Sequence, residues 1–296
     1  MMSRKTTPGA FLSVIMPAHN AENTVKRAAV TTLRAMPRDS ELLIFLDACT
    51  DKTKDIVSTI SDRRLKILEG TEQHGVSAAL NVLLAHATGT YIARMDADDI
   101  CLPWRFTHQL RKISKTKGDF LFGNAVLFGS RLKPFGFAPQ IPFPLSSKQS
   151  LMALLLGNPF VHPAMIAKAS SMRQIGGYRE APAEDYDLWL RAAIDGMRIE
   201  RSSAYAVLYR VHSRQLTQQT VWQERLENDT TLRATKAALA ERLLGRSPQK
   251  SWDTFEISRK LWNFSEAGLA VRWGIFRAIG TTSFLRLVKK DIDKSV

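Results

Sequence analysis

Short apolar runs alternate with helix-like stretches through the first third of the chain, and this alternation constrains the fold more than any other feature. The apolar runs, which read as strands, cover residues 11–16, 42–46, 65–68 and 90–95. The stretches between them carry apolar residues at helical spacing over 21–36, 53–60 and 76–87. This β-α-β-α-β-α-β order predicts an α/β fold, with a mostly parallel central sheet flanked by helices.

Polar residues collect where three of these strands end. They form the segments 17–20, 47–51 and 96–99. In parallel sheets, ligands bind in the crevice beyond the carboxyl ends of the strands. We therefore expect the three segments to face one rim and to line a ligand site.

The last of these segments is acidic. Asp96 and Asp98 are two residues apart, so in extended backbone their side chains point the same way. Two adjacent carboxylates repel unless a cation lies between them, and hard oxygen ligands suit Mg²⁺ or Mn²⁺. Met95-Asp96-Ala97-Asp98-Asp99 is thus a candidate metal site. The alternative is a solvated turn in which Asp99 caps a helix that starts near Pro103.

The middle segment contains Asp47 and Asp51. Asp51 is well placed to cap the helix that follows it. Asp47 has no such role, and at a strand end its carboxylate can accept from a pyrimidine N–H.

Three further segments carry candidate site residues. His162 follows a turn at Gly157–Pro159, and it either lines an acceptor cleft or is a half-buried residue of a strand over 161–167. Glu184 and Asp185 begin a predicted helix, where acids complement the helix dipole, but a carboxylate can also deprotonate a hydroxyl. His212 follows a strand and is either a third metal ligand or structural.

The chain divides near residue 216 in our interpretation. Residues 1–216 form one domain, with a first half over about 10–100 and a second half over about 101–216. Residues 217–296 form a helical C-terminal extension. A basic amphipathic helix in 265–296 either lies on an anionic membrane or packs on the catalytic domain or on a second subunit, which leaves a homo-oligomer open.

Composition narrows the partners and the compartment. The net charge of +14 favours anionic partners, but no block of five consecutive basic residues and no zinc-finger spacing indicates nucleic acid. Two cysteines make no disulfide framework, and no run reaches the ~18 apolar residues of a membrane span. We expect a cytoplasmic protein, with any membrane contact peripheral at the inner face.

Taken together, the motifs resemble those of the family 2 glycosyltransferases, which have a GT-A fold. The resemblance covers roughly residues 11 to 217, in the family's order. Its pieces are SVIMPAHNAENTV, DACTD, HGVSAALNVLLAHATGTYIARMDADD, FVHPAMI, GGYRE, EDYDLWLR and YRVHSRQLT.

The resemblance makes residues 1–216 a GT-A catalytic domain, with a nucleotide-binding half over about 10–100 and an acceptor half over about 101–216. It also implies roles for particular residues. It makes Asp98 the principal metal ligand, Asp185 the catalytic base and Glu184 its support or an acceptor contact. It brings Asp96 near the ribose and the metal, and His212 near the metal or diphosphate. The residues implied at the nucleotide-sugar are Pro17, Ala18, Asn20, Glu22, Asp47 and Asn81.

Two departures from the family's pattern matter. Ala48 stands where the family often has glycine, so the geometry of that loop is expected to differ. The segment 75–81 lacks the basic residue often found there, and Arg94 or Arg210 can replace its charge.

We therefore predict an inverting, metal-dependent glycosyltransferase. It moves a sugar from a nucleotide-sugar, expected to be a UDP-sugar, to a hydroxyl of a glycan, lipid-linked or protein acceptor in cell-envelope glycan synthesis. The alternatives are a transfer-inactive nucleotide-sugar-binding protein of the same fold and a nucleotidyltransferase. The latter should show a Gly-rich basic loop after the first strand, which Pro17-Ala18-His19-Asn20 is not.

Overall fold

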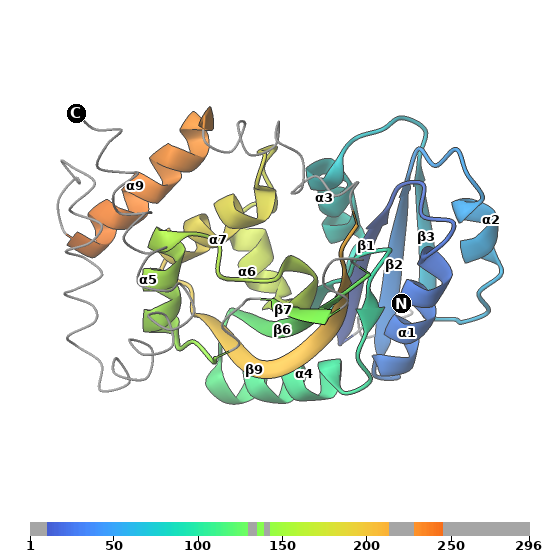
Figure 1. Ribbon diagram of the computed structural model, residues 1–296, viewed down its shortest axis with the longest axis horizontal. Coiled ribbons are helices and arrows are strands. Elements are labelled where there is room, and N and C mark those ends of the chain that lie inside the picture. Colours follow the sequence, from blue (N-terminus) through green and yellow to red (C-terminus); the bar gives the residue numbers. More distant parts are fainter. Residues whose placement is uncertain (1–10, 130–134, 139–142, 213–227, 245–296) are drawn as a thin grey trace, which may run out of the picture.

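A computed structural model describes residues 11–129, 135–138, 143–212 and 228–244 of the chain. Its first half is the predicted parallel unit (Figure 1). The strands are β1 (Leu12–Ala18), β2 (Ser40–Asp47), β3 (Leu65–Gly70) and β4 (Tyr91–Arg94), in the spatial order β3-β2-β1-β4. The connecting helices are α1 (Val25–Ala35), α2 (Thr53–Ser58) and α3 (Val76–His86).

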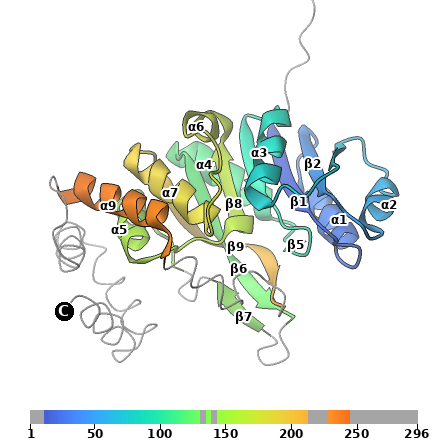
Figure 2. The same cartoon turned by 90° about the horizontal axis from the view of Figure 1, so that it is seen from above.

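The second half makes the sheet mixed rather than mostly parallel. β8 (Met165–Lys168) pairs antiparallel with β4 and joins the two halves into one sheet. The order continues through β6 (Phe120–Phe128), β9 (Ile199–Arg210) and β5 (Ile100–Cys101), while β7 (Phe135–Ala138) pairs with β6. Figure 2 shows β7 and the end of β6 projecting beyond the rest of the sheet.

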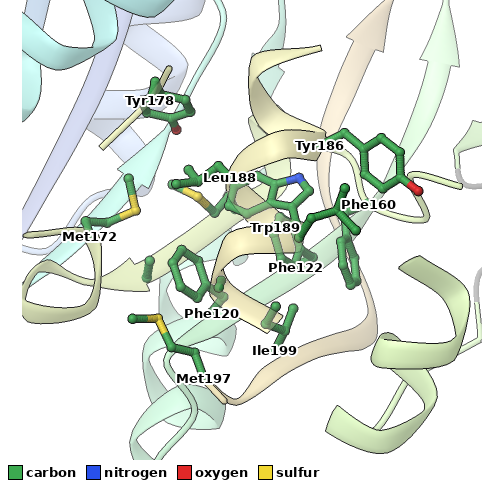
Figure 3. Packing of buried hydrophobic residues seen from close by; sticks show 14 of the residues in the cluster. Phe120, Phe122, Phe160, Met172, Tyr178, Tyr186, Leu188, Trp189, Met197 and Ile199 are labelled. Carbon is green, nitrogen blue, oxygen red and sulfur yellow. The ribbon is translucent and has the colours of Figure 1, made fainter. Parts of the chain in front are cut away.

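Helices cover both faces of the sheet. One face packs on α1, α2 and α4 (Arg105–Thr116), with Phe106 and Ile113 fully buried. The other packs on α3, α5 (Ser147–Leu156), α6 (Ala169–Gln174), α7 (Glu184–Ile194) and α9 (Thr230–Leu244). Trp189 on α7 lies edge-on to Phe120 and Phe122, at ring distances of 5.6 and 4.8 Å, and centres this second core (Figure 3).

Two predicted element boundaries were wrong. β1 does not stop at Pro17 but continues to Ala18. The Ile15 carbonyl accepts from the Met95 N–H, so the backbone polar groups of Ile15 point toward β4. The backbone groups of successive strand residues point to alternate sides, so those of Pro17 also point toward β4. Pro17 lies beyond the last β1–β4 pair, which is Ile15 with Arg94. Its missing N–H therefore breaks no ladder bond.

The other correction concerns the predicted strand over 161–167. Its first part is a 3₁₀ turn, η1 (His162–Ala164), and only Met165 onward is strand. Pro163 explains the change, because it has no N–H to donate to a ladder. His162 is therefore not a strand residue, and it is 7% exposed rather than half-buried.

The helix α9 is the described part of the predicted C-terminal extension. It packs against α7 and α5, with Leu232, Leu239 and Ala240 buried in the second core. The expected boundary near 216 and the basic helix in 265–296 lie outside the described residues. Within the described ranges, no helix combines the length and apolar character needed to span a bilayer.

Candidate functional site

The loops that follow β1 and β2 are tied together by side chains predicted to contact the nucleotide. Asn20 Oδ1 accepts from the Thr50 N–H at 2.8 Å, and Glu22 Oε2 accepts from the Lys52 N–H at 3.1 Å. Asp51 accepts from the Glu22 N–H at 3.0 Å and from the Thr53 N–H at 2.9 Å. Asp51 was expected at the N-cap position of α2, but Lys52 occupies that position and Asp51 lies one residue before it. Pro17 and Ala18 end the strand beside these loops.

Ala48, which stands where glycine was expected, adopts a φ of 48°. That is the left-handed region, which a residue with a Cβ enters at a cost of about 1–2 kcal/mol. The backbone of this loop thus takes a conformation that glycine favours, despite the substitution.

Asp47 lies at the end of β2 and is buried. Its two oxygens accept from the N–H groups of His74 and Gly75, at 2.8 and 3.1 Å. These bonds hold the loop that leads into α3. Asp47 therefore positions this loop, and its contact with a base stays a prediction.

The acidic segment after β4 gives each carboxylate a different partner. Asp96 is paired with the Arg94 guanidinium through both oxygens, at 2.7 and 2.5 Å. Asp98 faces His212, with Oδ2 and Nε2 3.2 Å apart. Burial raises the pKa of Asp96 to about 6, although Arg94 opposes the rise.

Asp99 is not the helix cap that the acidic-turn interpretation required. It is 1% exposed, and its Oδ1 accepts from the Arg210 N–H at 2.8 Å. Arg210 also donates from Nε to the Asp98 carbonyl at 3.0 Å. The helix α4 begins only at Arg105, after Trp104 at the N-cap position. Asp99 therefore fastens the acidic segment to the end of β9, which brings His212 to Asp98.

Asp98 and His212 fit one divalent cation as two of its ligands. Adjacent ligands of an octahedral ion with bonds of about 2.1 Å lie about 3 Å apart, close to the 3.2 Å found here. No group of three or more acidic, histidine or cysteine side chains among the described residues forms a ready metal cage. Two protein ligands plus substrate phosphates are a usual arrangement for such ions.

A second acidic pair lies at the start of α7. Asp185 accepts from the Asn158 amide at 2.8 Å and from the Tyr186 N–H at 2.7 Å. Glu184 lies 3.7 Å from His162. Burial, with Asp185 next, raises the pKa of Glu184 to about 7, and burial also raises the pKa of Asp185.

Arg94 connects the two acidic groups electrostatically. It is 7% exposed and pairs with Asp96, and its charge also lowers the pKa values of Glu184 and Asp185. The metal-site candidate and the candidate base therefore lie around one buried cation. Arg94 is thus engaged within the site rather than free to replace a basic residue of segment 75–81.

Asn81 has a structural task. Its amide donates to the Tyr178 carbonyl at 2.8 Å, and its Oδ1 accepts from the Tyr178 N–H at 2.9 Å. Gly177 has a φ of 70°, and a Cβ there would lie 2.5 Å from Asn81 Oδ1, so only glycine fits. Asn81 thus joins α3 to the turn before α7, and its contact with the donor stays a prediction.

Comparison with known proteins decides the family. The sequence profile named glycosyl transferase family 2 matches residues 13–174. The chain belongs to glycosyl transferase family 2. It is a glycosyltransferase with the GT-A fold. Membership of this family argues against the alternative prediction of a nucleotidyltransferase.

Two relatives of this family 2 glycosyltransferase come from bacteria. The glycosyltransferase EpsE of Bacillus subtilis is 34% identical over 64% of this chain and 69% of its own length. A second relative is the Escherichia coli protein WfgD, named UDP-Glc:alpha-D-GlcNAc-diphosphoundecaprenol beta-1,3-glucosyltransferase. The two proteins are 34% identical over a match that covers 38% of this chain and 45% of WfgD.

Two solved structures share the fold. S. aureus TarS 1–349 in complex with UDP-GlcNAc has a TM-score of 0.62 and 18% identity, covering 86% of this chain and 74% of that chain. The Pyrobaculum calidifontis mannosyltransferase PcManGT, in complex with GDP-Man and Mn²⁺, has a TM-score of 0.58 and 17% identity, covering 95% and 85%.

Two residues of the glycosyltransferase site, Asn158 and Tyr178, carried too little signal to be assigned from sequence, and the pairing of Arg94 with Asp96 was not predicted. Asn158 and Tyr178 lie in turns that the sequence marked only as turns, and Arg94 lies inside a strand. Their partners are far away in the chain, at Asp185 for Asn158 and at His162 for Tyr178. The available clues were that Tyr178 lies within the family motif GGYRE and that Asn158 lies two residues before the motif FVHPAMI.

Proposed function

We propose that this enzyme transfers a sugar from a UDP-sugar to a hydroxyl acceptor with inversion, that it requires a divalent metal, and that it acts in cell-surface glycan synthesis. The observation that carries the proposal is the arrangement around Arg94. The pair Asp98–His212 suits a metal-bound diphosphate, and Asp185 suits a base. The shared influence of Arg94 supports one reaction site.

Asp185 is the proposed base. Its carboxylate removes the acceptor proton while the acceptor oxygen forms a bond to the anomeric carbon and the bond from that carbon to the diphosphate breaks. A single displacement from the opposite face inverts the anomeric centre. Asn158 and the Tyr186 N–H each donate to this carboxylate and so fix its direction.

Asp98 and His212 would hold the metal, with Asp96 nearer the ribose. The bound cation supplies charge that stabilises the leaving nucleoside diphosphate. The Mn²⁺ complex of the mannosyltransferase neighbour supports this assignment by analogy of fold. His212 is 41% exposed in its side chain, so the site is open to a ligand from solvent.

The choice of donor and acceptor rests on the relatives. WfgD is named for a UDP-glucose donor and a diphosphoundecaprenol-linked acceptor, and TarS was solved with UDP-GlcNAc. We therefore propose a UDP-sugar and a lipid-linked sugar, reached by a cytoplasmic enzyme in peripheral contact with the inner face of the membrane. The basic C-terminal helices are the proposed contact, and association of two chains is left as an alternative for them.

The base is tested with Asp185→Asn. We expect transfer to fall about 10²–10⁴-fold, while donor affinity, measured by calorimetry, stays unchanged. Asp195→Asn is the matched control, because Asp195 is an exposed residue at the other end of α7. Substantial remaining transfer by Asp185→Asn would contradict the base assignment.

The metal is tested by donor binding with and without Mn²⁺. We expect UDP-sugar to bind more weakly in a chelator, and His212→Ala to raise the Mn²⁺ concentration needed for half-maximal binding. Equal donor affinity with and without Mn²⁺ in the wild type would rule out the site. His108, an exposed histidine on α4, provides the control substitution His108→Ala.

A further inference from the structure

A buried histidine lies behind the acidic pair of α7 and outside the proposed chemistry. His162 in η1 is 7% exposed, and its ring is edge-on to Trp189 at 5.6 Å. Burial lowers its pKa well below the usual value, so the imidazole is neutral. A neutral imidazole carries one N–H and one acceptor nitrogen, and which nitrogen is which depends on its neighbours.

Tyr178 decides the tautomer of this ring. Its hydroxyl lies 2.8 Å from His162 Nε2, and it is 4% exposed. The phenol carries its proton at neutral pH, and the Glu184 carboxylate favours the ring proton on the nitrogen that faces it, so the phenol donates to Nε2. Nε2 is then the acceptor, and the ring proton is on Nδ1. That nitrogen lies 3.7 Å from Glu184 Oε1.

The three side chains lie in line, from the Tyr178 hydroxyl through His162 to the Glu184 carboxylate. The 3.7 Å between Nδ1 and Oε1 is longer than a hydrogen bond, so the imidazole N–H acts on Glu184 through its dipole. Tyr178 is itself fixed, because Asn81 makes two hydrogen bonds to its backbone. The imidazole N–H favours the ionised form of Glu184. An ionised Glu184 in turn favours proton uptake by its neighbour Asp185, which makes Asp185 a stronger base.

We propose that His162, oriented by Tyr178, is a positioning residue that favours the ionised form of Glu184 beside the base Asp185, against the burial that disfavours it. The inference rests on the proposed function, in which Asp185 is the base. His162 itself does not touch the substrate in this account. It acts through Glu184.

Other charged groups face Glu184 and set the background against which His162 acts. Asp185 on α7 and Asp96 after β4 raise the pKa of Glu184, and Arg94 on β4 lowers it. None of these is altered by substitution at His162, so a change in the titration of Glu184 reports the lost N–H.

Two substitutions of His162 by amide residues test its contacts with Glu184 and with Tyr178 one at a time. Asparagine reaches about as far as Nδ1, so His162→Asn keeps a donor toward Glu184. Glutamine reaches about as far as Nε2, so His162→Gln keeps a partner for the Tyr178 hydroxyl and loses the donor toward Glu184. If His162 had only a structural role, His162→Asn and His162→Gln would have the same effect on the titration of Glu184.

The experiment is a pH titration of Glu184 in the full chain, by NMR of ¹³C-carboxyl-labelled glutamate, with the signal assigned through its loss in Glu184→Gln. We expect the midpoint to rise by about one pH unit in His162→Gln and to stay near the wild-type value in His162→Asn. The acid limb of kcat/KM for the acceptor, which reports ionisation of the base Asp185, should move to lower pH in His162→Gln, because Asp185 then has a less negative neighbour. Equal midpoints in the two variants would overturn the proposal.

A third variant guards against misfolding of either amide. Tyr178→Phe keeps the buried ring and removes only the donor that fixes the tautomer, so the midpoint of Glu184 should rise by less than in His162→Gln; no rise would overturn the proposal. The titration needs no turnover. If Asp185→Asn keeps transfer activity, the proposed base is wrong while the midpoints still report on His162.

Discussion

The two acids that open α7 differ in what they do to stability. Glu184 has a folded pKa of about 7, above the usual value of 4.5 for an unfolded glutamate. Between these two values the folded chain binds more protons than the unfolded chain, so the free energy of unfolding falls as pH rises through this window. Glu184 thus weakens the fold under the conditions in which the proposed reaction runs.

Removing this charge should stabilise the protein. We expect Glu184→Gln to raise the free energy of unfolding by about 1–3 kcal/mol at a pH of about 8, and to change it little at a pH of about 3.5, where glutamate is largely protonated in both states. Urea unfolding at the two pH values measures the difference. Glu180→Gln, at an exposed position just before α7, should have no such pH dependence; a stabilisation that is equal at both pH values would contradict the prediction.

At the scale of elements, α9 is as much a part of the second core as the helices of the catalytic domain. Leu239 is fully buried there, and Thr235 bonds to Asp187 at 3.3 Å. We expect Leu239→Ala to lower the free energy of unfolding by about 2–5 kcal/mol, because it leaves a cavity between α9 and α7. Chemical denaturation of the wild type and of Leu239→Ala measures this difference in the free energy of unfolding.

The control for this substitution lies on the same helix. Glu241 is exposed, so Glu241→Ala should change stability by no more than about 0.5 kcal/mol. If the two variants unfold alike, α9 does not contribute the packing described here.

The sequence was most informative about elements with a clear period and about the family. The parallel unit β3-β2-β1-β4 follows from alternating runs, and the GT-A fold follows from the ordered motifs. It could not show that β8 runs antiparallel beside β4, because strand direction across a long connection leaves no local pattern. The mixed sheet was therefore missed.

For the site, the sequence marked the acids but not their partners. Asp99 was expected at a helix cap because Pro103 follows it, yet it binds Arg210 more than a hundred residues later. Asp96 pairs with Arg94 at the end of β4. The sequence predicted this strand only as an apolar run, so the pair was not expected. Contacts between distant segments depend on the tertiary fold, and one sequence does not encode them as spacing.

At the scale of the whole molecule, one sheet and two shared cores join the nucleotide half to the acceptor half. The second core contains Ile15 and Phe45 from the nucleotide half together with Trp189 from the acceptor half and Leu239 from α9. We expect a single unfolding transition, because neither half can lose its core without exposing that of the other.

Two probes can test this cooperativity. All six tryptophans follow residue 103, and four of them follow residue 216, so fluorescence reports on the acceptor half and the C-terminal extension, whereas far-UV circular dichroism reports on the whole chain. The two denaturation curves should coincide. Separate midpoints would show that the halves unfold independently.

The place of β8 in the sheet also has a consequence for the order in which the protein is made. During synthesis, the four parallel strands of the first half emerge before their neighbour β8, which ends at Lys168. Until then the side of β4 that β8 will cover presents unpaired N–H and C=O groups, the kind of edge on which chains aggregate. The nascent chain therefore passes through a stage that chaperones would recognise, and it leaves that stage only when more than half of its residues have been translated.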